Sequence, residues 1–252
     1  MTALAASLDR ALRVAEAAPE GYARAVASDA DGTLWAGDVA DTLFLDASTR
    51  GLFQGEGLAH FLAGARAVLG DGATGDPRRD GPAVLDAYAR GAIDITTLCN
   101  LQTQSLGGRS LASLDALLEG AAETVAARIH PEVRRLLAET AARGWPLHVV
   151  SGSLGRLVAR TLTLAAIPFA SVSGGVLKVE GDWVHAALAG PIPLHAHKID
   201  ALKAQGAWPP ALGLGDGGWD APFLHGAFAA ALIEPKPALR DAMREHPRCF
   251  TL

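Results

Sequence analysis

The chain has 252 residues, of which 50% are hydrophobic and 19% are charged, so it can bury a substantial core in one domain or one domain with an insertion. Its formal net charge is -5 and its Lys and Arg residues are scattered, which argues against a nucleic-acid partner. The two cysteines, Cys99 and Cys249, lie far apart without a metal-ligand spacing, and they predict free thiols in a reducing compartment.

The first twenty residues contain Asp9, Arg10, Arg13 and Glu16, which interrupt any apolar run that a signal peptide or a membrane span would need. Apolar residues recur at helical spacing through the same segment, so it is predicted to form an amphipathic helix that precedes the first strand. We therefore expect a soluble cytoplasmic protein without a membrane partner.

Four short apolar runs predict buried strands, and helical segments separate them, as a parallel sheet requires. They are ARAVAS before Asp29, WPLHVV at 145–150, ALGLGD at 211–216 and AFAAALI at 227–233. After the second run, Ser153 is a candidate N-cap for the helix that follows. The pattern predicts an α/β fold with a doubly wound, mainly parallel sheet.

Residues 39–130, between the first two strands, show helical periodicity, broken by Gly and Pro at 70–82 and by glycines at 105–110. No strand pattern stands out there. We interpret this segment as an inserted helical cap, which leaves residues 1–38 and 131–252 as the α/β core. A smaller excursion at 174–188 alternates around EGD and predicts a β-hairpin attached to the core.

Polar residues follow three of the predicted strands. Asp29 and Asp31 come after the first strand, Ser151 after the second, and Asp216 with Asp220 at the end of the third. In an open parallel sheet, ligands bind beyond the carboxyl ends of the strands where the strand order reverses. The sequence therefore predicts that these residues form one site.

Carboxylates that converge in one cleft repel one another, and a hard divalent cation, for which Mg²⁺ is the natural candidate, is the usual way to hold them together. Such an ion can also hold a phosphate in line with an attacking carboxylate. Lys198 would supply a positive charge for phosphate oxygens. The backbone N–H groups of Gly152 and Ser153, expected where a helix begins, would assist.

The order of these pieces, DxDGT, an isolated Ser after a strand, a Lys and then GDGxxD, resembles the four motifs of phosphatases of the haloacid dehalogenase (HAD) superfamily. The resemblance covers nearly the whole core. It implies that Asp29 is the nucleophile and Asp31 the general acid/base, acting through a phospho-aspartate intermediate. It also implies that Asp29, the backbone carbonyl of Asp31, and Asp216 bind Mg²⁺.

The same resemblance implies that Ser151 and Lys198 bind phosphate and that Asp220 orients metal-bound water. The helical insertion matches the cap of the phosphoserine phosphatase-like branch, and a small phosphorylated metabolite is the expected substrate. Two other classes are disfavoured: a haloacid dehalogenase does not need the proton of Asp31, and a non-catalytic phosphoryl-ligand binder is expected to lack an acid.

The residues that follow the first motif bear on the substrate. In phosphoserine phosphatases an acid at this place receives the substrate ammonium, and Asp38, with Asp41 close by, corresponds to it. Asp38 could equally cap the first cap helix. Trp219 replaces the asparagine that is usual in GDGxND.

A cap arginine for the carboxylate of phosphoserine cannot be chosen from sequence among six candidates. They are Arg50, Arg66, Arg78, Arg79, Arg90 and Arg109. If none faces the pocket, phosphocholine, phosphoethanolamine or other phosphomonoesters become better candidates than phosphoserine. Nothing in the sequence fixes the oligomeric state.

Two histidines and two tryptophans lie near or inside the motifs without an assigned catalytic role. His195 and His197 lie beside Lys198 without a zinc-binding spacing, so they are expected to be loop residues. Trp35 and Trp219, each inside a motif, could pack in the core or line the substrate pocket.

Overall fold

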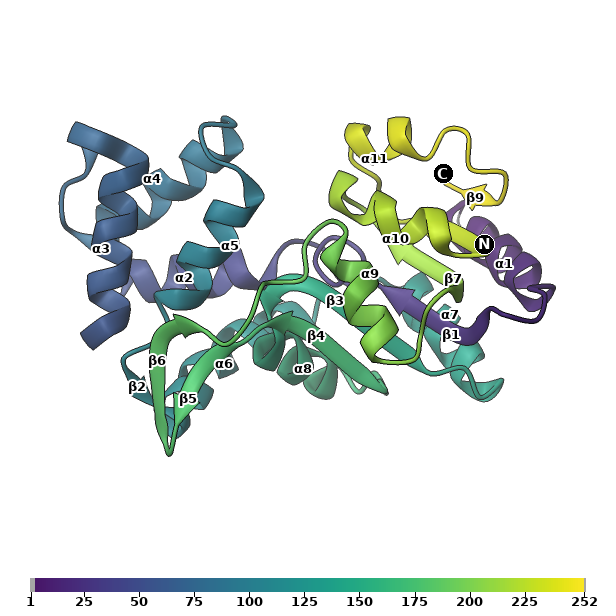
Figure 1. The fold of residues 1–252 in the computed structure, drawn as a ribbon, viewed down its shortest axis with the longest axis horizontal. Helices are drawn as coiled ribbons and strands as arrows, with labels where there is room; N and C mark the ends of the chain where they lie inside the picture. Colours follow the sequence, from purple (N-terminus) through teal and green to yellow (C-terminus); the bar gives the residue numbers. More distant parts are fainter. Residues whose placement is uncertain (1–2, 252) are drawn as a thin grey trace.

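The computed structural model describes residues 3–251 as a helix-flanked parallel sheet with a helical lobe beside it (Figure 1). Helix α1 (Ala3–Glu16) leads into the central strand β1 (Ala23–Ser28), as the N-terminal pattern predicts. The sheet continues with β3 (Leu147–Leu154), β4 (Ser171–Gly175), β7 (Pro210–Gly215), β8 (Ala229–Leu232) and β9 (Cys249–Phe250). The expected α/β fold is confirmed, and β4 and β9 are strands that the apolar runs did not reveal.

The strand order β4-β3-β1-β7-β8-β9 places β1 inside the sheet, and every pairing in it is parallel. The chain moves outward from β1 to β3 and β4, and then returns to the other side of β1 for β7 to β9. The strand order therefore reverses at β1. The carboxyl ends of β3, β1 and β7 frame the crevice where such sheets bind ligands.

Successive residues of the strands alternate between two apolar layers, because side chains of a strand point to opposite faces. Val26 and Val149 belong to one layer, and Ala27 and Val150 to the other. The first layer includes residues of α1, α7 (Pro131–Ala142) and α8 (Gly155–Leu164). The second includes residues of α9 (His197–Ala204), α10 (Ala221–Gly226) and α11 (Pro237–Ala242). Both faces are covered, which explains why the strands read as continuous apolar runs.

The segment between β1 and α7 forms the helical lobe seen at the left of Figure 1. Its elements are α2 (Val39–Thr49), α3 (Gly55–Leu69), the 3₁₀ turn η1 (Gly70–Gly72), α4 (Pro77–Ala89), α5 (Ile95–Gln104), β2 (Arg109–Ser110) and α6 (Leu111–Ala126). The longest described helix, α6, has 16 residues, and none of the helices within residues 3–251 is long and apolar enough to cross a membrane.

The hairpin of β5 (Leu177–Glu180) and β6 (Trp183–Leu188) is present, but its sheet partner differs from the expectation. Strand β6 pairs antiparallel with β2 of the lobe, not with the core sheet, and Gly108 N–H donates to the Val184 carbonyl at 2.7 Å. The expectation that the lobe contains no strand is therefore wrong. A two-residue strand is too short to produce a sequence period, which is why the pattern did not show it.

Candidate active site

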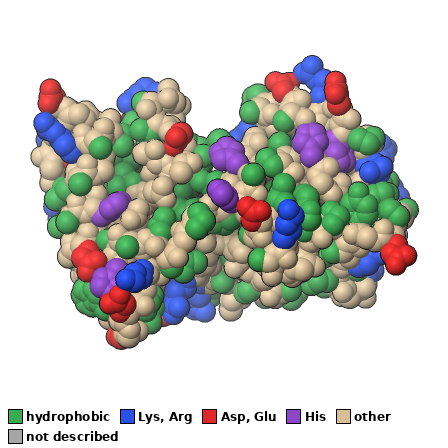
Figure 2. All heavy atoms as spheres, in the orientation of Figure 1, with side chains coloured by type: hydrophobic (Ala, Val, Ile, Leu, Met, Phe, Trp, Pro, Cys, Tyr) green, Lys and Arg blue, Asp and Glu red, His purple; other side chains and the backbone are tan. Residues whose placement is uncertain are grey.

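A cleft of about 430 Å³ opens where the carboxyl ends of β1, β3 and β7 face the helical lobe. The surface is hollowed between the lobe and the sheet core (Figure 2). Of the site residues predicted from sequence, all except Asp220 line this cleft. The reversal of strand order thus brings together residues that are far apart in the chain.

Lys198, on α9, joins two of the predicted acids. Its Nζ lies 2.5 Å from Asp29 Oδ1 and 2.6 Å from Asp220 Oδ1, and its side chain is only 1% exposed. The second oxygen of Asp220 accepts the backbone N–H groups of Asp216 and Gly217 at 3.1 and 2.9 Å. Asp220 therefore fixes both the turn after β7 and the position of Lys198. Its role in orienting metal-bound water stays a prediction.

Acidic side chains outnumber cationic ones at this place, and the pKa values of Asp29 and Lys198 are both raised. Burial is the main factor that raises the pKa of Asp29; Lys198 opposes the shift, but the carboxylates of Asp220, Asp216 and Asp31 add to it. Burial opposes charge on Lys198, yet its contacts with Asp220 and Asp29 outweigh this and raise its pKa. These contacts favour the charged form of Lys198, and the carboxylates around Asp29 outnumber this lysine.

Three carboxylates lie close enough to share one cation. Asp29, Asp216 and Asp220 each place an oxygen so that the three atoms lie within 4.8 Å of one another. Oxygen donors at this spacing suit a hard ion such as Mg²⁺. Both oxygens of Asp220 are occupied, one by Lys198 and the other by two backbone N–H groups, whereas Asp29 and Asp216 each have only one oxygen paired with a lysine. Asp29 and Asp216 are therefore better placed to hold the ion.

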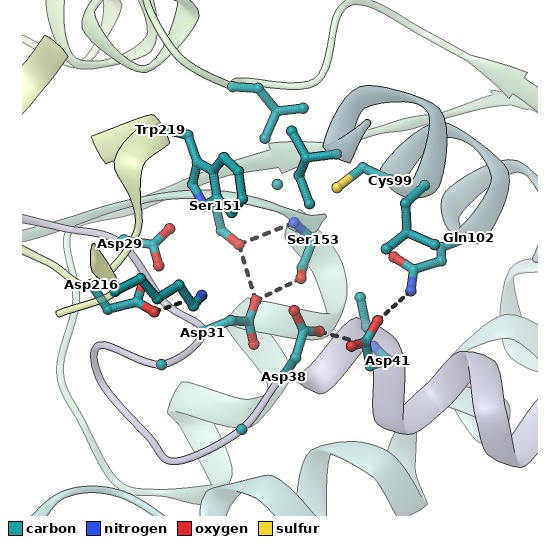
Figure 3. Close-up of a pocket in the computed structure, with 18 of the residues that line it drawn as sticks. Asp29, Asp31, Asp38, Asp41, Cys99, Gln102, Ser151, Ser153, Asp216 and Trp219 are labelled. Carbon is teal, nitrogen blue, oxygen red and sulfur yellow. Dashed lines mark hydrogen bonds and ion pairs between the residues drawn. The ribbon is translucent and has the colours of Figure 1, made fainter. Parts of the chain in front are cut away.

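Asp31 is oriented by four donors, of which Figure 3 shows the hydroxyl groups of Ser151 and Ser153. Its Oδ1 accepts the Trp35 indole N–H at 2.9 Å and the Val39 backbone N–H at 2.7 Å. Its Oδ2 accepts the Ser153 hydroxyl at 2.6 Å, and the Ser151 hydroxyl lies at 3.4 Å. The carboxylate thus lines the cleft in a fixed orientation, two residues along the chain from Asp29.

The expected helix start after Ser151 is wrong in its details. Strand β3 runs on to Leu154, α8 begins at Gly155, and the N-cap position has no side-chain hydrogen bond. Ser153 donates to Asp31 instead of capping the helix, and its N–H donates to Ser151 Oγ at 3.0 Å. The pair of free N–H groups that we expected at a helix start at Gly152 and Ser153 is therefore absent.

The absence of a side chain at Gly152 allows close packing at the end of β3. A Cβ at this position would lie 2.9 Å from Leu194 Cδ2 and 3.2 Å from Cys99 Sγ of α5. The glycine allows the lobe to approach the end of β3, so it shapes the wall of the cleft. A phosphate contact by its backbone stays a prediction.

The glycine of DADGT has a comparable reason. Gly32 has a φ of +76°, and its N–H donates to the carbonyls of Trp35 and Gly37. A Cβ here would overlap the carboxylate of Asp216. Only glycine permits both the left-handed turn and the close approach of the third strand's acid to the loop after the first.

Lys236 is a site residue that the sequence interpretation missed. It follows β8, lines the cleft, and places its Nζ 2.8 Å from Asp216 Oδ2. The signal was available, since Lys236 comes just after the fourth predicted strand as the acids come after theirs. Of the two options for Trp35, core packing is confirmed: it is fully buried in the first apolar layer, and its indole N–H also donates to Asp31. Trp219 lines the cleft.

The far end of the cleft is acidic. Asp38 Oδ1 accepts the Asp41 backbone N–H at 2.8 Å, so Asp38 caps α2, and it also lines the cleft. Burial raises its pKa, and Asp31 and Asp41 raise it further. Gln102 of α5 donates to Asp41 Oδ1 at 2.7 Å. The capping interpretation is therefore correct, and it does not exclude contact with substrate.

No arginine within residues 3–251 lines this cleft. Of the six candidates, Arg50, Arg66 and Arg78 form ion pairs with acids on the lobe surface, and Arg109 donates to the Leu52 carbonyl. His195 packs edge-on to Trp219 at 6.3 Å, and His197 lies 3.4 Å from Asp200, so neither belongs to the carboxylate cluster.

Comparisons with known proteins bear on the family and the fold of this chain. A family model described as haloacid dehalogenase-like hydrolase matches residues 26–225. No curated protein sequence matches the chain significantly.

Among solved structures, a protein of unknown function from Bordetella pertussis Tohama I is 17% identical, with 91% of this chain and 98% of that chain covered and a TM-score of 0.67. A substrate-bound phosphoserine phosphatase is 14% identical, with coverage of 92% and 94% and a TM-score of 0.55. Cytosolic 5′-nucleotidase IIIB bound to cytidine is 14% identical, with coverage of 96% and 84% and a TM-score of 0.53. At these identities the likeness concerns the fold.

Proposed function

The chain belongs to the haloacid dehalogenase-like hydrolases, and from this we propose that it is a Mg²⁺-dependent phosphatase that acts on small phosphomonoesters. One observation carries the proposal: Lys198 holds Asp29 at the reversal point of the sheet, while Asp31 is held separately by its own donors. Two acids in different environments can perform two different roles.

In the proposed reaction, a carboxylate oxygen of Asp29 attacks phosphorus and the ester P–O bond breaks. Asp31 gives a proton to the leaving alkoxide, and then takes one from the water that cleaves the acyl phosphate and restores Asp29. Lys198 keeps Asp29 in place throughout. A bound Mg²⁺, held by Asp29, Asp216 and the backbone carbonyl of Asp31, would neutralise charge on the phosphate.

The proposed leaving group is a small alcohol that carries a cation and no carboxylate. Asp38 and Asp41 place two carboxyl groups at the far end of the cleft, where a substrate cation would favour their charged form, whereas a substrate carboxylate would find no arginine among the described residues there. Phosphoethanolamine and phosphocholine therefore fit better than phosphoserine. Tyr88 and Trp219, which also line the cleft, offer aromatic faces that suit an alkylated ammonium group.

The arrangement of the acids does not favour either alternative class, a carbon–halogen hydrolase or a non-catalytic phosphoryl-ligand binder. Carbon–halogen hydrolysis requires no proton for the departing halide, yet Asp31 is positioned by a tryptophan, a serine and a backbone N–H. A protein that only binds a phosphoryl ligand has no need of the Asp29–Lys198–Asp220 arrangement beside a second oriented acid.

The test is a panel of phosphomonoesters, with phosphate and halide release assayed side by side with and without Mg²⁺. We expect phosphate release from phosphoethanolamine or phosphocholine, slower release from phosphoserine and from glycerol phosphate, and loss of activity with excess EDTA that added Mg²⁺ restores. Halide release from a haloacid, or tight binding across the panel without turnover, would contradict the proposal.

Asp38→Asn should lower kcat/KM for the cationic substrates by about tenfold and leave glycerol phosphate nearly unchanged, because it removes one charge near the leaving group. Asn retains the helix cap, whereas Asp38→Ala should also destabilise α2 by about 1 kcal/mol. Asp94→Asn is the matched control, since Asp94 caps α5 through the N–H of Thr97 at 2.7 Å and does not line the cleft. An equal loss on all substrates would rule out the ammonium-binding role.

A further inference from the structure

Two ammonium groups line the cleft, and they are held in different ways. Lys198 is buried and bonded to two carboxylates, Asp29 and Asp220. The side chain of Lys236 is 55% exposed and its ammonium pairs with Asp216 alone among the described carboxylates. Lys198 is therefore a fixed part of the site, whereas the ammonium of Lys236 can leave its partner without disturbing the core.

The base of Lys236 is nevertheless anchored. Its backbone N–H donates to the carbonyl of Asp216 at 2.8 Å, and Pro237 follows at the start of α11. Its Nζ lies 5.8 Å from the centroid of the Trp219 ring, which also lines the cleft. Movement of the ammonium thus requires only rotations within the side chain, and the tip stays inside the cleft.

We propose that Lys236 competes with the divalent cation for Asp216 and that, once displaced, it supplies positive charge to the phosphate. This rests on the proposed function, because it takes Asp216 as a metal ligand. The ammonium sits on a carboxylate oxygen of the triad that suits a cation. A cation that binds Asp216 competes with this ion pair for the carboxylate and is repelled by the charge of the ammonium.

Removal of the Lys236 charge should change the affinity for the cation and the affinity for phosphate in opposite directions. The acids that line the cleft or pair with its lysines outnumber the two lysines; they are Asp29, Asp31, Asp38, Asp41, Asp216, Asp220 and Glu234. Loss of Lys236 makes the empty cleft more negative, which favours the cation and disfavours phosphate. By linkage, the cation in the native protein raises phosphate affinity partly by freeing Lys236.

The experiment uses the full chain with three substitutions. Lys236→Met removes the charge and keeps the apolar stem over Trp219, and Lys236→Arg keeps the charge. Lys203→Met, on the exposed face of α9 and outside the cleft, controls for the loss of one positive charge elsewhere. Binding of Mg²⁺ alone, and of inorganic phosphate at saturating Mg²⁺, is measured by calorimetry without turnover.

We expect Lys236→Met to bind Mg²⁺ about three- to tenfold more tightly and phosphate several-fold more weakly, while Lys236→Arg and Lys203→Met stay near the native values. Structural damage would weaken both ligands together, and that outcome would overturn the proposal, as would unchanged Mg²⁺ affinity. If neither the native protein nor any variant bound Mg²⁺, the metal site assumed in the proposed function would be contradicted as well. Unchanged Mg²⁺ affinity with intact Mg²⁺-dependent turnover would remove only the role of Lys236.

Discussion

Asp29→Asn should lower turnover of the best phosphomonoester by about 10⁴-fold or more, because the amide cannot attack phosphorus to form the acyl phosphate. The change is nearly isosteric, and Lys198 keeps Asp220 as a partner, so the fold should survive. Steady-state phosphate release gives the rate, and acid quenching with labelled substrate should detect phosphoprotein in the native protein and none in the variant.

Asp71→Asn is the control for this experiment, since Asp71 lies on the lobe surface in an exposed ion pair with Arg66, away from the cleft. It should retain native activity. If Asp29→Asn kept the native rate while its circular dichroism and metal binding were unchanged, the nucleophile would have to be another group.

Lys198→Met should abolish activity and destabilise the protein by about 3–5 kcal/mol, since it leaves two buried carboxylates without their shared counter-charge. Asp220 is fully buried and Asp29 nearly so, so water compensates little for the lost counter-charge. Urea unfolding of the Mg²⁺-free protein measures the change. The double variant Lys198→Met/Asp220→Asn should recover part of the loss, because it removes one of the two unpaired charges.

The loss should also depend on pH in a defined direction. The pKa of Asp29 is raised in the folded protein, chiefly by burial, and without Lys198 it would rise further. A raised folded-state pKa means that the native state binds protons more readily than the unfolded chain, so stability falls as pH rises through that pKa. Lys198→Met should therefore lose less stability at pH 5 than at pH 8. A loss below about 1 kcal/mol at pH 8 would show that the pair contributes little.

The architecture could be predicted because the buried strands carry their own signal. Strands covered on both faces appear as continuous apolar runs, and this identified β1, β3, β7 and β8. Strand β4, with the sequence SVSGG, and the two-residue β9 have no such run. Their positions follow from pairing with neighbouring strands, which a local pattern does not encode.

The site was predictable to the extent that it depends on topology. Asp29, Asp31 and Asp216 follow strands, so the sheet alone brings them to one edge. The hydrogen bonds among side chains are set by packing over long sequence separations, such as that of Ser153 with Asp31 or Lys236 with Asp216. The local sequence of Ser153 favoured a helix cap instead, and nothing in the sequence around Lys236 identifies Asp216 as its partner.

The hairpin β5–β6 limits how far the helical lobe can move relative to the core. A lobe inserted at one point would be joined to the core only by its two connecting segments and could swing about them as a hinge. Here the hairpin leaves the core directly after β4 and completes a three-stranded sheet with β2 of the lobe, so the lobe is braced at a second, separate place. Wide opening would require rupture of that small sheet. We therefore expect substrate to enter the cleft with only limited separation of the lobe from the core.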